Sequence, residues 1–153
     1  AQGKIIDALA ECVELISQLY AEYSLQLPGM QLFWNQLAKA EKQHAAVLRT
    51  MHRLLDKGNI FFNIGRFSHE AITETDAMIR KEYEHAQDRV VTKKYALDVA
   101  MKIESSLLDG HFYEIVTSDA PEFQIITKRL ASDTSRHLCM LQDAVSGCGP
   151  EDR

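Results

Sequence analysis

The sequence predicts an all-α protein: a bundle of four long helices, arranged as two helical hairpins with a short helix in the connector between them. Two observations lead to this fold class. Apolar residues recur at the three- and four-residue spacing of amphipathic helices over four long stretches, and proline or glycine interrupts the chain between the stretches of each pair. In addition, the second half of the chain repeats the pattern of the first.

The first hairpin is expected to span residues 3 to 57. We expect its first helix at about residues 5 to 25 and its second at about residues 30 to 56. The turn Leu27-Pro28-Gly29 stops the first helix, and Lys57-Gly58-Asn59 supplies a cation and a glycine where the second should end. A connection this short makes the two helices antiparallel neighbours.

The connector is expected at residues 58 to 91. Its first part is irregular and rich in phenylalanine, which suggests a segment that crosses the bundle end. Ser68 is the expected N-cap of a short, half-exposed helix that follows.

The second hairpin is expected at residues 92 to 145. Its helices should occupy about residues 92 to 117 and 121 to 145, because Pro121 suits the first turn of a helix. Residues 146 to 153 contain two glycines and are expected to form a tail. The chain of 153 residues is thus predicted to be one domain.

Composition narrows the range of functions. The net charge of -5 comes without a basic cluster, which argues against a nucleic-acid partner. No apolar run approaches the roughly 20 residues of a membrane span, and the N-terminal residues lack the layout of a secretory signal. Three scattered cysteines argue against a disulfide framework. We therefore expect a cytoplasmic protein that binds neither nucleic acid nor membrane.

Glu41 and His44 are the most informative pair of residues. They fall inside the apolar stripe of the second predicted helix, and their spacing of three puts both side chains on one face, where they can hold one metal ion. A buried carboxylate needs a cation or hydrogen-bond donors to offset its lost hydration. The alternative is that Glu41 pairs with a lysine or arginine of another helix and that His44 is an ordinary core histidine.

An internal repeat supplies a counterpart for this pair. A shift of 93 residues places Glu104 on Glu11, His137 on His44 and Pro121 on Pro28 without a gap. Other matches in the same register are Tyr113 on Tyr20, Leu130 on Leu37, Ala131 on Ala38 and Leu141 on Leu48. The repeat predicts a pseudo-twofold bundle in which two sets of Glu and His face each other across one core.

The predicted metal site therefore draws on all four long helices. Its candidate ligands are Glu11, Glu41, His44, Glu104 and His137. Inward carboxylates and imidazoles from four helices are what a di-iron or di-manganese carboxylate centre requires. In these residues the chain resembles the ferritin-like superfamily, and within it the rubrerythrin-like proteins, over about residues 3 to 145.

One position departs from the pattern of that family. Its fourth helix carries Asp-Glu-x-Arg-His, whereas this chain reads Asp133-Thr134-Ser135-Arg136-His137, so Thr134 stands in place of the glutamate. Three arrangements of a site without this glutamate remain open. Asp133 can take the role if the helix rotates or bulges; water or an exogenous anion can fill the gap; or one metal position is lost, which leaves a mononuclear or zinc-loaded site. We favour a dinuclear site completed by water or by Asp133.

Several neighbouring residues have two readings. The repeat favours Glu11 as the ligand from the first helix, whereas depth in the hairpin favours Glu14, and a solvated surface is the alternative for both. Tyr20 and Tyr113 either hydrogen-bond near the site or pack in the core. His52 and His111 are either outer partners of the ligands or rim histidines.

The resemblance implies iron as the cofactor, with zinc or manganese as alternatives, and a ferroxidase or weak peroxidase that handles iron or oxidative stress. O2 or H2O2 would be the oxidant. An external electron donor is needed, because the chain has no Cys-x-x-Cys pair for a rubredoxin-type site, and Leu107 stands where related peroxidases have a further glutamate. A homodimer is the expected assembly. The alternative function is a metal-depleted ferritin-like bundle that acts as a dimeric binding or scaffold module.

Overall fold

The computed structural model describes residues 2–56, 61–62, 69–109, 112, 116–117 and 121–147. The described part of the chain is almost entirely helical, as predicted. It contains the α-helices α1 (Gln2–Gln26), α2 (Gln31–Asp56), α3 (His69–Asp88), α4 (Lys93–Asp109) and α5 (Pro121–Ser146), the 3-10 helix η1 (Pro28–Met30), and the strands β1 (Phe61–Phe62) and β2 (Val116–Thr117).

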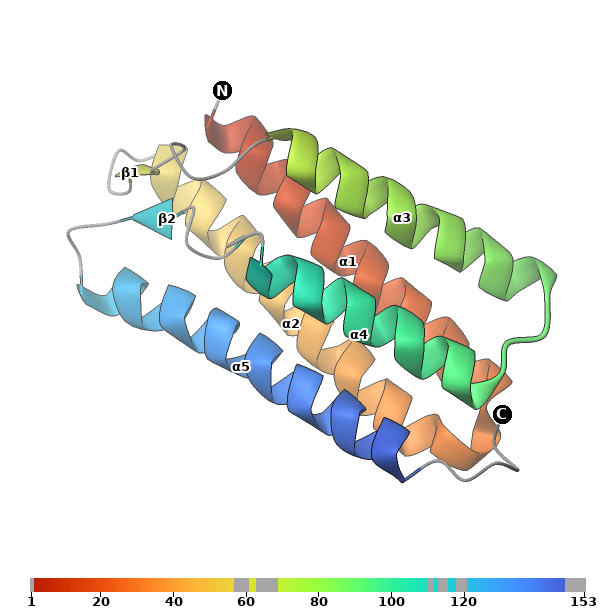
Figure 1. The fold of residues 1–153 in the computed structure, drawn as a ribbon. Helices are drawn as coiled ribbons and strands as arrows, with labels where there is room; N and C mark the ends of the chain where they lie inside the picture. The colour runs from red at the N-terminus through yellow and green to blue at the C-terminus, as the bar shows by residue number, and fades with distance from the viewer. Residues whose placement is uncertain are drawn as a thin grey trace.

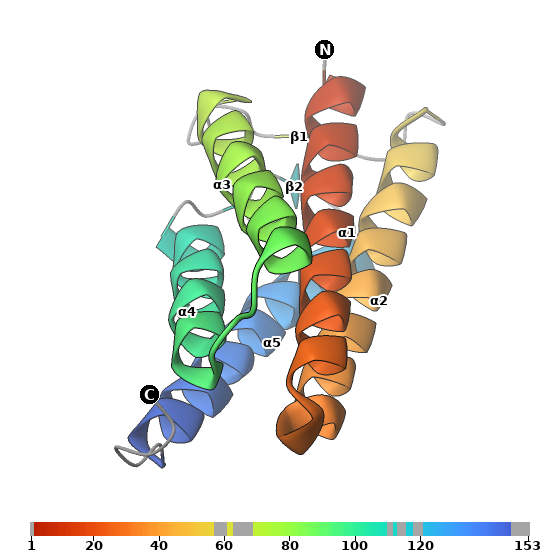
Figure 2. The same cartoon turned by 90° about the vertical axis from the view of Figure 1, so that its right-hand side faces the viewer.

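The helices form an elongated bundle (Figure 1). α1 and α2 lie side by side and antiparallel, and α4 and α5 do the same (Figures 1 and 2). α3 runs back along α1 to the end of the bundle at which α4 begins, so that α2 and α4 run in the same direction. At the opposite end, β1 pairs antiparallel with β2, with Phe61 opposite Thr117 and Phe62 opposite Val116.

The core is built mainly on α1, which packs against both α2 and α3. The largest fully buried side chains of the core include an aromatic cluster of Tyr20 and Tyr23 from α1 and Trp34 from α2. The ring of Trp34 lies 5.4 Å from that of Tyr20 and 5.0 Å from that of Tyr23. Burying one large apolar side chain stabilises a fold by about 1.5–3 kcal/mol.

Two predicted elements are wrong in extent. The third of the four predicted long helices, α4 in the structure, ends at Asp109 instead of continuing to residue 117, and Thr117 belongs to β2. In the sequence a glycine follows Asp109 directly, and glycine after a helix is a common stop signal. The helix expected to be short, α3, has 20 residues and buries Ile72 and Ile79 against the core. Its predicted cap, Ser68, lies outside the described residues.

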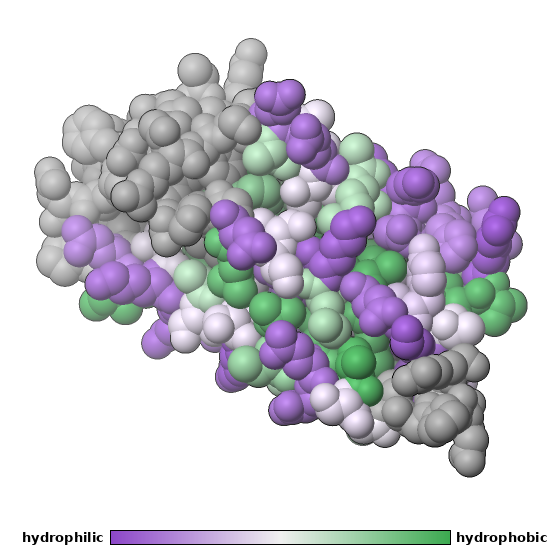
Figure 3. Space-filling view, in the orientation of Figure 1, coloured by the Kyte–Doolittle hydropathy of each residue, from purple (hydrophilic) through white to green (hydrophobic). Residues whose placement is uncertain are grey.

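The surface shown in Figure 3 mixes hydrophilic and hydrophobic side chains over α3, α4 and α5. Within the described ranges, no helix combines the length and the apolar composition that crossing a bilayer requires.

Gln26 joins the end of α1 to the connection between α3 and α4. Its amide nitrogen donates to the carbonyl oxygen of Ala86, and its Oε1 accepts from the backbone nitrogen of Val91 at 3.1 Å. Val91 is buried, so its backbone nitrogen depends on this partner.

We predict that Gln26→Ala lowers the free energy of unfolding by about 1–3 kcal/mol, because it leaves two backbone groups without partners. Urea denaturation followed by circular dichroism measures this change. Gln36→Ala, at an exposed position of α2, is the matched control and should alter stability by less than about 0.5 kcal/mol. Equal stability of the two variants would contradict a stabilising role for the hydrogen bonds of Gln26 to Ala86 and Val91.

Candidate metal centre

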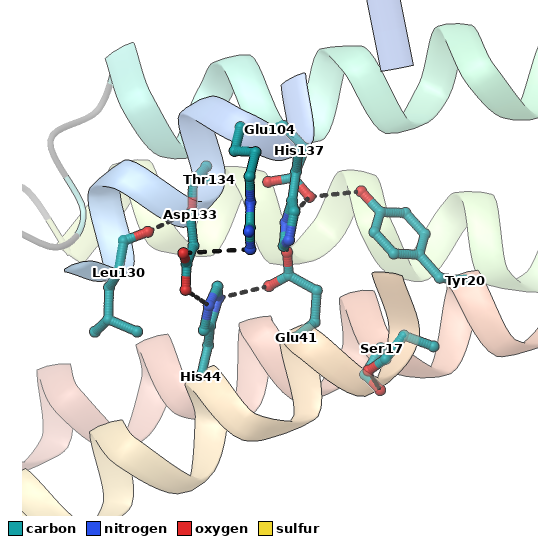
Figure 4. A network of polar contacts seen from close by, with 11 residues as sticks. Ser17, Tyr20, Glu41, His44, Glu104, Leu130, Asp133, Thr134 and His137 are labelled. Carbon is teal, nitrogen blue, oxygen red and sulfur yellow. Dashed lines mark hydrogen bonds and ion pairs between the residues drawn. The ribbon is translucent and has the colours of Figure 1, made fainter. Parts of the chain in front are cut away.

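Glu41, Glu104 and His137 come together in the core from α2, α4 and α5 (Figure 4). Nδ1 of His137 lies 3.2 Å from Oε1 of Glu41 and 3.7 Å from Oε1 of Glu104. One ligand atom of each residue lies within 4.8 Å of those of the other two. Both carboxylates are 0% exposed, and His137 is 2% exposed. The structure thus assembles three of the five predicted ligands within reach of a single ion.

The amphipathic pattern of the helices explains this burial. Along α2, Glu41 follows Leu37 and Ala38 and precedes Ala45 and Leu48, all of them buried. These residues are three or four positions from Glu41 or a further turn away, so they share its face of the helix. A carboxylate on that face has to enter the core.

His44 and Asp133 extend the cluster toward the surface. His44, only 5% exposed, places Nδ1 3.5 Å from Oε2 of Glu41 and Nε2 3.3 Å from Oδ2 of Asp133. Its ring stacks on that of His137 at a centroid distance of 5.8 Å. Asp133, half-buried, also meets the guanidinium of Arg136 at 3.4 Å. From the sequence, Asp133 lies about 100° around the helix from the inward-facing position 134. In the structure its carboxylate contacts His44 at the edge of the cluster.

The first helix contributes Tyr20 to the cluster. The buried Tyr20 hydroxyl donates to Oε1 of Glu104 at 3.1 Å, which confirms the first of its two sequence-based readings. Tyr113, its counterpart in the repeat, and His111 lie outside the described residues. His52 forms an ion pair of 2.7 Å with Asp7.

The prediction that Glu11 belongs to the site is wrong. Glu11 is exposed and lines a shallow surface pocket together with Asp76 and Arg80 of α3. Nine residues separate it from Tyr20, which is about 2.5 helical turns, so the two side chains leave α1 on opposite faces. The other candidate, Glu14, forms an ion pair with Arg49 of α2. The repeat register therefore fails in α1, where α3 covers a face that has no equivalent in the second hairpin.

The surroundings shift the pKa values of the two buried carboxylates in opposite directions. Burial acts to raise the pKa of Glu41, but the contact with His137 and the nearby imidazole of His44 outweigh it and hold that pKa below its usual range. Burial, together with the negative charge of Glu41, raises the pKa of Glu104 well above its usual value. Burial acts to lower the pKa of His137, but its bonds to Glu104 and Glu41 raise it to about 9. The surroundings therefore favour the charged forms of Glu41 and His137 and the neutral form of Glu104.

The cluster fits a metal ion in one specific respect. Oε2 of Glu41 and Oε2 of Glu104 are buried and have no hydrogen-bond partner in the described part of the chain. A buried polar group left without a hydrogen bond costs about 1–3 kcal/mol, and more if it is charged. A cation bound between the two oxygens removes that cost. Two carboxylates and one imidazole are a donor set that suits iron, manganese or zinc.

Thr134 limits what the cluster can bind. It is fully buried one turn before His137, and its hydroxyl donates to the carbonyl oxygen of Leu130 at 2.9 Å. It therefore adds no charge to the centre. A second ion would depend on His44, Asp133 and a shared Glu41.

Comparison of the chain with protein-family models, with curated proteins and with solved structures finds no match. The geometry of Glu41, Glu104 and His137 is therefore the basis on which a function is proposed.

We predict that the metal-free protein loses thermal stability between pH 6.5 and 9.5. The pKa of His137 is 6.5 in an unfolded chain and about 9 in the folded protein, so its contribution is complete below 6.5 and is lost as pH rises through 9. The raised pKa of Glu104 acts in the same direction. Melting in the presence of a chelator should show a fall of several degrees, at about 2–4 °C per kcal/mol.

His137→Gln should flatten this dependence relative to the native chain, whereas the matched variant His52→Gln should retain it. A melting temperature of the native chain that is constant or rises over this pH range would contradict the assigned charges.

Proposed function

We propose that this protein is a ferritin-like, rubrerythrin-like iron-binding protein of the cytosol that acts as a ferroxidase or weak peroxidase in iron or oxidative-stress handling. The observation that carries the proposal is the pair of buried carboxylates, Glu41 and Glu104, each with an oxygen that lacks a hydrogen-bond donor beside His137. Zinc and manganese are the alternative ions, because the donor set suits them as well.

The arrangement of the helices supports the ferritin-like part of the proposal. Two antiparallel hairpins, α1 with α2 and α4 with α5, enclose the cluster, and α3 returns the chain along the bundle between them (Figure 1). Each hairpin contributes an inward carboxylate, Glu41 in the first and Glu104 in the second. Carboxylates and histidines on facing helices are the usual way in which four-helix bundles hold metal ions.

The two metal positions in this proposal are unequal. The buried position has Glu41, Glu104 and His137 as ligands. The outer position has His44 and Asp133 and shares Glu41, and Asp133 is 31% exposed. The short distance from Asp133 to His44 favours the arrangement with Asp133 over complete loss of the second position. We expect the buried position to bind an ion first, because its three ligands already lie within reach of one ion and are shielded from water.

Bound iron would supply electrons to O2 or H2O2 one at a time, and the protein side chains would manage protons. Burial and the charge of Glu41 raise the pKa of Glu104 and so favour its protonated form, and Tyr20 donates to its Oε1. His44 and Asp133 lead from Glu41 toward the surface, which offers protons a route across the cluster. Electrons have to come from an external donor.

We predict that Glu104→Gln separates metal binding from stability. The metal-free variant should be as stable as the native chain or more stable, because glutamine has the shape of the neutral carboxyl group and its amide can donate to Glu41. Its affinity for Fe²⁺ should fall by about tenfold or more, which corresponds to 1.4 kcal/mol. Anaerobic titration with Fe²⁺, Mn²⁺ and Zn²⁺, followed by metal analysis, measures both stoichiometry and affinity.

Glu14→Gln, outside the cluster, is the matched control and should bind metal like the native chain. At a metal concentration of about 100 times Kd, binding should stabilise the native protein by about 2.7 kcal/mol. Less than one equivalent of each metal bound by the native chain would reject the proposal.

We predict that Thr134→Glu restores the second metal position. The new carboxylate would lie one turn before His137 on the same face of α5. Bound iron should rise by about one equivalent, and Fe²⁺ oxidation by O2 should become faster, as followed by absorbance. Without metal the variant should be less stable by about 2 kcal/mol or more, since it buries a third carboxylate.

Ser135→Glu, at the next and exposed position, is the control and should change neither quantity. An unchanged stoichiometry in a folded Thr134→Glu variant would contradict the assigned place of Thr134 in the site.

A second candidate function follows from Thr134. Because a buried threonine replaces a ligand and His137 already pairs with both glutamates, the bundle can also be a metal-depleted dimeric binding or scaffold module. In that case Glu41→Ala and His137→Ala would leave partner binding and the dimer intact, as sedimentation and pull-down experiments would show. Loss of function in these variants, with the fold retained, would reject this candidate.

A further inference from the structure

A groove of about 440 Å³ lies between α2 and α5, beside the metal centre. Apolar side chains of both helices line it, among them Val47, Met51, Ile126 and Leu130. His44 and Asp133 also line the groove and connect it to the cluster. A volume of this size lies in the range of small-molecule binding sites.

Two arginines give the groove a positive charge. Arg129 and Arg136 both line it, and with Asp133 between them they occupy positions four and three residues apart on one face of α5. Arg136 is 3.4 Å from Asp133, whereas Arg129 forms no ion pair with any described residue. The two guanidinium groups outnumber the one carboxylate, in a chain whose net charge is -5.

We propose that this groove binds a small monocarboxylate with an apolar chain, of the kind of a medium-chain fatty acid. The carboxylate would pair with Arg129 and Arg136, and the chain would cover the apolar lining. Arginine binds carboxylates with two parallel hydrogen bonds, and such charge-assisted bonds are about twice as strong as neutral ones. An apolar lining with a few charged groups at one place is typical of sites that fix the orientation of an amphipathic ligand.

The composition of the groove excludes other ligand classes. A cationic ligand would meet two arginines and only one carboxylate. A small hydrophilic anion would leave the apolar lining exposed to water and would gain nothing from it. The site therefore selects for a negative charge and an apolar body in the same molecule. It requires no bound metal, so it can be tested independently of the proposed function.

The test is a titration of the chelator-treated native protein with octanoate and decanoate, followed by calorimetry and by amide chemical shifts. We expect saturable binding, with the largest shifts at positions 40–51 of α2 and 126–136 of α5. Acetate, which lacks the apolar chain, and octylamine, which lacks the negative charge, should bind at least about tenfold more weakly. Equal binding of octylamine and octanoate would overturn the proposal.

Variants locate the site. The double variant Arg129→Gln with Arg136→Gln should bind decanoate about tenfold more weakly or worse, and Ala46→Phe should block the groove from its α2 side. Lys128→Gln, exposed and adjacent to Arg129 but outside the groove, is the matched control and should bind normally. Circular dichroism verifies the fold of each variant.

Absence of binding at millimolar fatty acid, or binding that survives both groove changes in folded variants, would overturn the proposal. A concentration-dependent dimer that Ala46→Phe abolishes would also overturn it, since a second copy of the chain would then occupy the groove. Because metal is absent throughout, failure here leaves the metal proposal unaffected, and failure to bind metal leaves this one unaffected.

Discussion

The structure depends on placing two carboxylates, Glu41 and Glu104, in the core of a bundle, where their ion-pair partners in the described part of the chain are histidines and not lysine or arginine. Desolvation of an ionised carboxylate costs several kcal/mol, and the surrounding groups offset it by sharing protons. The same contacts hold the two hairpins together: Tyr20 of α1 meets Glu104 of α4, and Glu41 of α2 meets His137 of α5. Polar groups that are difficult to bury thus specify how the hairpins face each other, a task that interchangeable apolar contacts perform less selectively.

Helix positions were largely predictable from local signals. Pro28 and Pro121 have fixed backbone angles and no amide hydrogen, and the chain changes element next to both. The end of α4 was missed because apolar residues continue at helical spacing past Asp109, while the glycine that follows is a local signal that this periodicity obscured. The full length of α3 was missed because its polar content hides a buried side that only packing on α1 reveals.

The site was predictable where apolar pattern and chemistry agree. Glu41 and His137 each lie in an apolar stripe, and their inward direction follows from helical spacing. Glu11 depended on the repeat register and on the family resemblance, and neither specifies which face of α1 the rest of the protein covers. Tyr20 and Asp133 act through hydroxyl and carboxylate groups whose direction depends on side-chain torsions and on the relative placement of helices. Sequence spacing carries little information about either.

The polar chain of the cluster leaves the core on one side only in the described part of the structure. Beyond Tyr20 it meets the buried ring of Trp34. Beyond His44 it continues to Asp133 (Figure 4), which in turn contacts the exposed Arg136. Exchange of an ion would therefore proceed past the buried His44 and the half-buried Asp133, and requires these side chains to change rotamer. Opening of a packed helix pair is far slower. The residence time of a bound ion would then be set by its ligands and by these side-chain rotations, and not by the lifetime of the fold.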